Sequence, residues 1–173
     1  MTRAAIILTT ILTLMIDAAL AGNAFEIKNV YVGMSRDDFK KVSEICGDRD
    51  ECVNTDAYKP FDTIAGEEPK YWTIKFVNDK IDTILVGLNQ PSFVPIRNAL
   101  IKKFGKPRST SEEIVGNKFG ARFKRSISTW SHSGNSMLLM SHSVDLDSAT
   151  LMIVSARANK ESDSATARKG NDL

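Results

Sequence analysis

The chain has 173 residues, of which 42% are hydrophobic and 25% are charged, and its formal net charge at pH 7 is only +2. A charge this small does not fit a nucleic-acid-binding protein, which needs a strongly basic face to neutralise phosphates. The length and the hydrophobic content fit one globular domain preceded by a short extra segment.

The first 24 residues have the pattern of a cleavable export signal. Arg3 supplies a positive charge, residues 4–16 are largely apolar, and Ala19-Leu20-Ala21 is an A-x-A cleavage site, with Gly22-Asn23-Ala24 as a second candidate. A membrane anchor is the competing interpretation, but the apolar run contains three threonines and ends at Asp17, short of the roughly 20 residues that span a bilayer. We therefore expect a periplasmic or secreted protein, cleaved after Ala21 or Ala24, with no stable membrane insertion afterwards.

Two short amphipathic helices are predicted. The first follows Ser35, a typical N-cap residue, and ends at Gly47. The second carries Ile96, Leu100 and Phe104 at every fourth position. Because each helix has one apolar face, each must cover an apolar surface elsewhere in the protein.

Runs rich in β-branched and aromatic residues predict the strands of a sheet. We expect strands at residues 71–76, 81–88, 126–132, 137–142 and 149–155, and a further short strand within residues 27–32. Asn78-Asp79 and Gly134-Asn135 are the expected turns of two hairpins. In the first hairpin, Phe76 would then face Ile81, and Lys75 would face Asp82.

This order of elements predicts an α+β fold, an antiparallel sheet of about five to six strands with two short helices packed on one face. A duplication of a helix-plus-hairpin unit is compatible with the same order. The expected organisation is a signal peptide at residues 1–24, a single α+β domain at residues 25–156 and a disordered tail at residues 157–173. The tail is charged, small and without an apolar face, which is the composition of a disordered segment.

Cys46 and Cys52 are the only cysteines, and a lone pair in an exported chain predicts a disulfide bond. Their spacing differs from the C-x-x-C of redox enzymes. Closing so small a loop contributes roughly 2 kcal/mol, so the bond would fix the end of a helix more than it would hold the whole fold.

Motifs for enzyme chemistry are missing from the sequence. It contains no G-x-S-x-G elbow, S-x-x-K, H-E-x-x-H or Walker-type glycine loop. The predicted second hairpin places His132 and His142 on opposite faces of the sheet, where they could not share a metal ion. We expect no catalytic residue, no metal site and no cofactor.

Three aromatic residues are candidates for contact with a protein partner. Tyr58 and Phe61 lie in the long segment between Gly47 and Pro69, which is either a binding loop or an extra element folded over the sheet edge. Trp130 is either a core residue or, if it is exposed, an interface anchor. The acid-rich residues 48–68 and the base-rich residues 97–125 are either solvated surfaces or regions that steer a charged partner.

Three short motifs carry a resemblance to a protein family. Gly33-Met34-Ser35 opens an acidic helix start, Phe104-Gly105-Lys106-Pro107 ends the second helix, and Trp130 lies in a later strand. Together they resemble the small periplasmic proteins of the SmpA/OmlA type and the related β-lactamase-inhibitor-like proteins. The resemblance implies helices packed on one face of an antiparallel sheet and a function in binding other proteins. The chain differs from the assembly lipoproteins because no cysteine for lipid attachment follows the signal.

The leading expectation is therefore an exported protein without enzymatic activity that binds a protein partner in the cell envelope, as an assembly factor or an inhibitor-like module. Its binding surface would be the sheet face or the loop between Cys46 and Cys52. One alternative is an envelope hydrolase that uses the acidic residues of segment 48–68. Another is a carrier that holds a small ligand on the apolar sheet face under the two helices.

Overall fold

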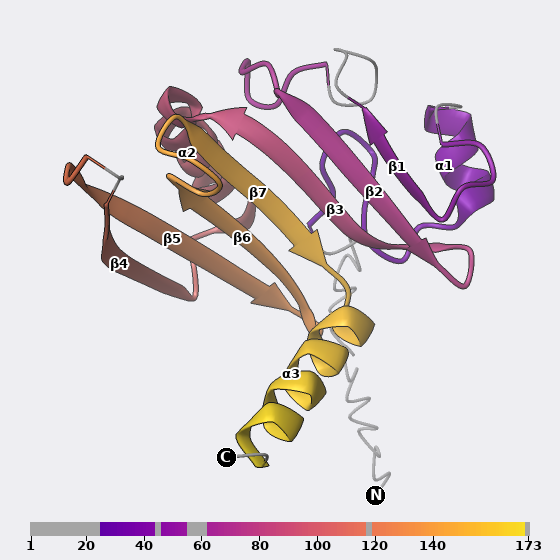
Figure 1. The fold of residues 1–173 in the computed structure, drawn as a ribbon. Helices are drawn as coiled ribbons and strands as arrows, with labels where there is room; N and C mark the ends of the chain where they lie inside the picture. The colour runs from indigo at the N-terminus through magenta and orange to yellow at the C-terminus, as the bar shows by residue number, and fades with distance from the viewer. Residues whose placement is uncertain (1–24, 44–45, 55–61, 117–118, 172–173) are drawn as a thin grey trace, which may run out of the picture.

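A computed structural model describes residues 25–43, 46–54, 62–116 and 119–171 (Figure 1). One antiparallel sheet of seven strands runs through this part of the chain, in the order β1-β2-β3-β7-β6-β5-β4. The strands are β1 (Glu51–Asn54), β2 (Tyr71–Val77), β3 (Lys80–Asn89), β4 (Ser109–Gly116), β5 (Arg122–His132), β6 (Asn135–Ser141) and β7 (Ser148–Val154). The helices are α1 (Arg36–Val42), α2 (Phe93–Phe104) and α3 (Ala156–Asn171), with a 3-10 turn, η1 (Gln90–Ser92), before α2. The α+β class is confirmed, but the expected five to six strands and two helices are too few.

Each half of the sheet begins with a helix and continues as antiparallel strands. In the first half α1 precedes β1, β2 and β3, and in the second half α2 precedes β4, β5, β6 and β7. The last strands of the two halves, β3 and β7, pair with each other in the middle of the sheet.

One face of the sheet is buried beneath α1, α2 and the segment before α1. Phe39 of α1 meets Phe76 of β2 edge to face, with ring centroids 5.7 Å apart. Helix α2 buries Ile96 and Leu100 on the same core. Figure 1 shows the opposite face toward the viewer, with α2 behind the strands. The core therefore lies between the sheet and a single layer of helices.

Both predicted helices are present, and their ends follow from local chemistry. Ser35 caps α1, because its hydroxyl accepts a hydrogen bond from the backbone N–H of Asp38 at 3.1 Å. The helix ends at Val42, earlier than expected. Helix α2 ends before Gly105, whose φ of 81° is readily adopted only by glycine.

Two edge strands were not predicted. Strand β1 has only four residues and lies in what the sequence presents as a long loop. Strand β4 has an almost fully exposed, polar sequence with no alternating pattern. By contrast, the strand proposed within residues 27–32 is absent, because Ile27 and Val30 instead close a tight turn through reciprocal backbone hydrogen bonds of 2.9 and 3.0 Å.

The hairpin registers differ in part from the prediction. Phe76 faces Ile81 as expected, but a bulge then pairs Lys75 with Thr83, so the expected pair of Lys75 with Asp82 is wrong. In the second hairpin the turn residues are Ser133 and Gly134, both with positive φ. That register is two residues from the predicted one, a shift that leaves every side chain on its expected face.

The predicted disordered tail is a helix as far as Asn171, so that prediction is wrong. Ser155 caps its first turn by accepting a hydrogen bond from the N–H of Ala158 at 3.1 Å. Arg157 fastens the helix to Asp82 of β3. The composition of the tail did not predict this helix, because polar contacts at its first turn hold it and an apolar face does not.

Within the described residues no helix has the length and hydropathy required to cross a membrane.

Candidate protein-binding surface

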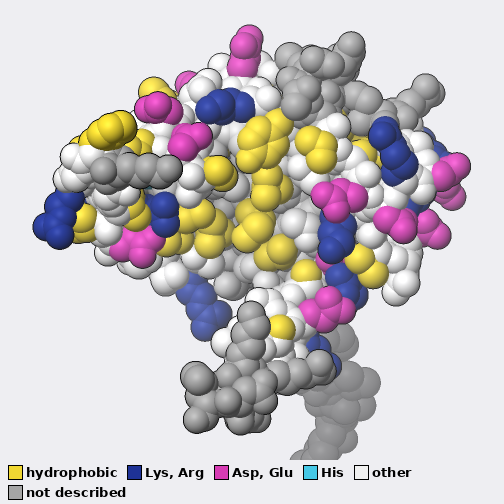
Figure 2. Space-filling view, in the orientation of Figure 1, with side chains coloured by type: hydrophobic (Ala, Val, Ile, Leu, Met, Phe, Trp, Pro, Cys, Tyr) yellow, Lys and Arg dark blue, Asp and Glu magenta, His cyan; other side chains and the backbone are white. Residues whose placement is uncertain are grey.

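The sheet face opposite the helices carries a continuous strip of partly exposed apolar side chains. We call it the open apolar strip, and its members are Tyr71, Leu85, Met152, Leu138, Met140 and Ile127. Strand pairing aligns them, since Leu85 of β3 faces Met152 of β7, which in turn faces Leu138 of β6. Figure 2 shows hydrophobic side chains running down the middle of this face with charged groups on both sides. None of the described helices lies across it.

The strip exists because apolar and polar residues do not simply alternate in β3 and β7. In β3 and β7 the core side chains alternate with further apolar residues, so that Leu85 stands between Ile84 and Val86, and Met152 between Leu151 and Ile153. An antiparallel sheet with one solvated face ordinarily places polar residues at such positions. The sequence signal is therefore present in the two apolar runs, although the strand pattern alone does not say which of their side chains face outward.

Tyr71 lies at one end of the strip, and the position of its ring requires a glycine on the neighbouring strand. It pairs with Gly87, and a Cβ atom built on Gly87 would lie 2.2 Å from Cε1 of the tyrosine ring. The ring therefore lies across the bare backbone of β3, and only glycine leaves it this room. A large, flat, amphipathic ring held partly exposed on a rigid strand is a typical interface anchor.

Trp130 does not belong to this surface. Its side chain is only 3% exposed, lies on the helix-covered face, and donates a hydrogen bond from the indole N–H to the carbonyl oxygen of Gly105 at 2.8 Å. Trp130 thus joins β5 to the end of α2 from within the core, and its candidacy as a partner-binding residue is withdrawn. The other two candidates, Tyr58 and Phe61, lie outside the described residues.

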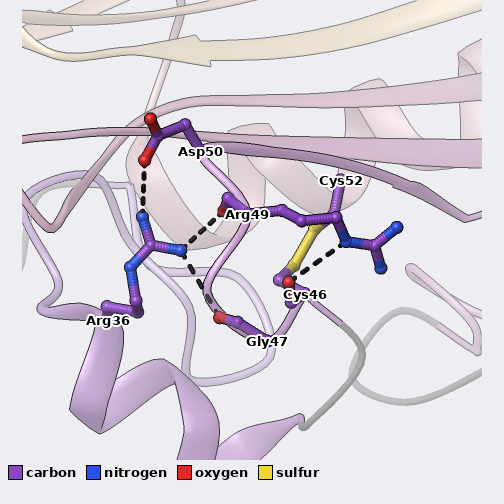
Figure 3. Close-up of a disulfide and its surroundings, with 6 residues drawn as sticks. All are labelled: Arg36, Cys46, Gly47, Arg49, Asp50 and Cys52. Carbon is purple, nitrogen blue, oxygen red and sulfur yellow. Dashed lines mark hydrogen bonds and ion pairs between the residues drawn. A yellow bond between two sulfur atoms is a disulfide. The ribbon is translucent and has the colours of Figure 1, made fainter.

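The loop between Cys46 and Cys52 is held by a disulfide and by one buried arginine (Figure 3). Arg36 of α1 donates hydrogen bonds to the carbonyl oxygen of Arg49 at 2.6 Å and to the carboxylate of Asp50 at 2.9 Å. Its guanidinium also lies 4.2 Å from the ring centroid of Phe76. The arginine and the disulfide fix the loop against α1 and so position the start of edge strand β1.

Three acidic side chains near this loop form ion pairs. Asp48 accepts a hydrogen bond from Lys40 at 2.7 Å, and Asp50 and Asp79 both bind Arg36. The hydrogen bond from Lys40 lowers the pKa of Asp48. A general acid near neutral pH needs a pKa shifted in the opposite direction. The geometry of Asp48 therefore gives no support to the hydrolase alternative.

Across the described ranges there is no cluster of three or more histidine, cysteine, aspartate or glutamate side chains that could hold a metal ion. His142 has its Nδ1 atom 2.6 Å from the carbonyl oxygen of Leu146, an arrangement that orders the turn after β6.

No protein-family model matches the chain, and searches of curated proteins and of solved structures found no match either. The resemblance to the SmpA/OmlA-type and β-lactamase-inhibitor-like proteins thus stays a prediction.

Proposed function

We propose that this protein is an exported binding module, without enzymatic activity of its own, that holds a protein partner in the cell envelope against the open apolar strip. The observation that carries the proposal is the strip itself, a row of apolar side chains on the sheet face that no described helix covers. The disulfide between Cys46 and Cys52 is compatible with an oxidising compartment outside the cytoplasm.

The shape of the strip favours a protein over a small molecule as its occupant. It crosses the five adjacent strands from β2 to β5, which at a spacing of about 4.8 Å corresponds to a width of about 20 Å. Small ligands prefer concave sites that bury most of their surface. A sheet face of this width suits a protein interface, to which each partner contributes about 800 Å².

The composition of the strip supports the same assignment. Met140 and Met152 bring flexible, polarisable side chains that adapt to the shape of a partner. At its border Arg125 holds Glu113 at 3.0 Å, so a charged pair flanks the apolar centre. An apolar centre with a polar rim is the usual anatomy of an interface between proteins that also exist apart.

Arginine substitutions on the strip test this proposal. In Leu138→Arg and Met152→Arg the aliphatic stem still covers the sheet while the guanidinium places a charge on the face. Val94→Arg is the matched control, because Val94 is 59% exposed and lies on α2, away from the strip. Each tagged variant is captured from envelope extract after gentle cross-linking.

The proposal predicts one stoichiometric partner with the natural protein and with Val94→Arg, and a loss of at least tenfold with either strip variant. Circular dichroism and the melting temperature establish that the variants are folded. Equal capture by all three folded variants would exclude the strip as the binding surface.

A further inference from the structure

On the helix-covered side of the molecule lies a second surface feature, a shallow apolar groove of about 250 Å³. Its floor consists of Ile27, Ile64 and Leu100, which are at most 7% exposed. Ala99 and Phe104 of α2 form one wall. The groove is separate from the open apolar strip, and the inference below does not depend on the proposed function.

Two tight turns form the rest of the groove. One turn is closed by hydrogen bonds between Ile27 and Val30, and the other by hydrogen bonds of 2.8 and 3.0 Å between Ile64 and Glu67. The backbone polar groups of Ile27 and Ile64 are thereby satisfied within their own turns, so the groove can lose its water without leaving them unpaired. Ile27, Ile64 and Ala65 make the surface of these turns mainly apolar, and Lys28 is the charged residue that they add to the lining.

The turn conformations are unusual for their residues. Lys28 has a φ of 52° and Ala65 a φ of 54°, in the left-handed region that non-glycine residues rarely adopt. Both residues line the groove. Such strained positions are found preferentially where a binding surface is being shaped.

Two ammonium groups stand at the rim of the groove. Lys103 donates a hydrogen bond to the carbonyl oxygen of Glu26 at 2.7 Å, and its Nζ atom lies 5.3 Å from the ring centroid of Phe104. Lys28 forms a loose ion pair with Asp62 at 3.4 Å, in which both side chains are more than 40% exposed. Each ammonium has donors to spare for a further acceptor, since a lysine carries three.

We infer that the groove binds a short anionic amphiphile, namely an acyl chain with a carboxylate head. The chain would lie on Ile27, Ile64 and Leu100, and the carboxylate would accept hydrogen bonds from Lys28 and Lys103. The volume is slightly below the roughly 300 Å³ at which pockets for drug-sized ligands begin, so a chain of medium length is the suitable occupant. The two lysines that line this mainly apolar groove favour such an occupant over a neutral or cationic one.

The test uses decanoate, decanol and decyltrimethylammonium below their aggregation concentrations, titrated into the folded, disulfide-bonded full chain and followed by backbone amide NMR. Decanoate should shift the amide signals of Lys28, Ala65, Ala99 and Phe104. It should bind up to about thirtyfold more tightly than decanol, because each of the two exposed cations contributes at most about fivefold. The cationic probe should bind most weakly.

Substitutions then locate the site. Ala99→Met should fill the groove and abolish decanoate binding, while Lys28→Asn and Lys103→Gln should each weaken it severalfold. Asparagine is chosen because it tolerates a positive φ. Lys102→Gln is the matched control for Lys103→Gln, since it removes the same charge from the neighbouring exposed position of α2.

Three results would overturn the inference: no binding of decanoate, shifts confined to the open apolar strip, or decanol binding as tight as that of decanoate. Leu138→Arg should bind decanoate as the natural protein does. If that variant loses partner capture but still binds decanoate, the two surfaces act separately. Failure of one proposal is then distinguishable from failure of the other.

Discussion

Arg157, in the first turn of α3, forms a two-pronged ion pair with the buried carboxylate of Asp82. The Nε atom donates to Oδ1 at 2.9 Å and an Nη atom donates to Oδ2 at 2.6 Å, while the Ser155 hydroxyl donates to Oδ1 as well. Asp82 is the extra residue of the bulge in β3, which frees it from cross-strand pairing. One irregularity in the sheet thus provides the anchor for the terminal helix.

Replacing this carboxylate should release α3 while the sheet remains intact. Asp82→Asn removes the charge and presents an amide N–H₂ to donors, so we expect a loss of about 1–3 kcal/mol in the free energy of unfolding. Hydrogen exchange at residues 158–166 should accelerate far more than exchange in β6 or β7. Unchanged protection of α3 would contradict the anchoring role of Asp82.

The same pair predicts a dependence of stability on pH. Burial alone would raise the pKa of Asp82, but hydrogen bonds from Arg157 and Ser155 outweigh it and hold the pKa below the ordinary value of 3.8. A lowered carboxyl pKa adds stability that is complete above 3.8 and is lost as the pH falls through the folded-state value.

The difference in melting temperature between the natural protein and Asp82→Asn should therefore be constant from pH 7 to pH 5 and shrink below pH 3.8. Comparing the two proteins cancels the effect of the other carboxylates, including Asp38 and Asp48, whose pKa values are also lowered by lysine partners. A difference that does not change with pH would mean that the charge of Asp82 has no role in stability.

The disulfide should stabilise the folded protein but should not be required for folding. The double variant Cys46→Ala/Cys52→Ala should lose about 2 kcal/mol in urea denaturation, the value for closing a loop this short. Arg36 still holds the loop through its contacts with Arg49 and Asp50, so the variant should fold. Dithiothreitol should destabilise the natural protein by a similar amount and leave the double variant unchanged.

Trp130→Phe tests the assignment of this residue to the core. The change removes the donor to the Gly105 carbonyl and leaves space beneath α2, so we expect a loss of about 1–3 kcal/mol. Partner capture per folded molecule should stay the same. A stable variant with weakened capture would instead favour an exposed, binding role for the tryptophan.

The elements that the sequence predicted well are those whose signal is local. The apolar spacing of Ile96, Leu100 and Phe104 predicted α2, and Asn78-Asp79, both at positive φ, placed the first hairpin turn and the pair of Phe76 with Ile81. The bulge after this pair has no turn residue or glycine to announce it. It is seen in the strand register, which passes from the pair of Phe76 with Ile81 to the pair of Lys75 with Thr83.

The candidate surface could be predicted only in outline. The sequence suggested a sheet face as a binding surface but named Trp130, because the faces of β5 cannot be told apart until the position of α2 is known. Leu85 and Met152 were not singled out, because an apolar run has no polar alternation that marks its outer face. Tertiary packing decides which face of the sheet the helices cover. It therefore also decides whether a leucine of the sheet is buried in the core or exposed to a partner.

The most direct test of the account is site-specific photo-crosslinking in the cells that produce the protein. A benzophenone amino acid is placed at position 138 or 152 on the open apolar strip, and at position 94 on α2 as the control. If the strip binds the partner, positions 138 and 152 should each give one discrete adduct with the same protein, and position 94 should give none. Adducts formed equally from all three positions, or from position 94 alone, would contradict the assignment of the strip as the binding surface.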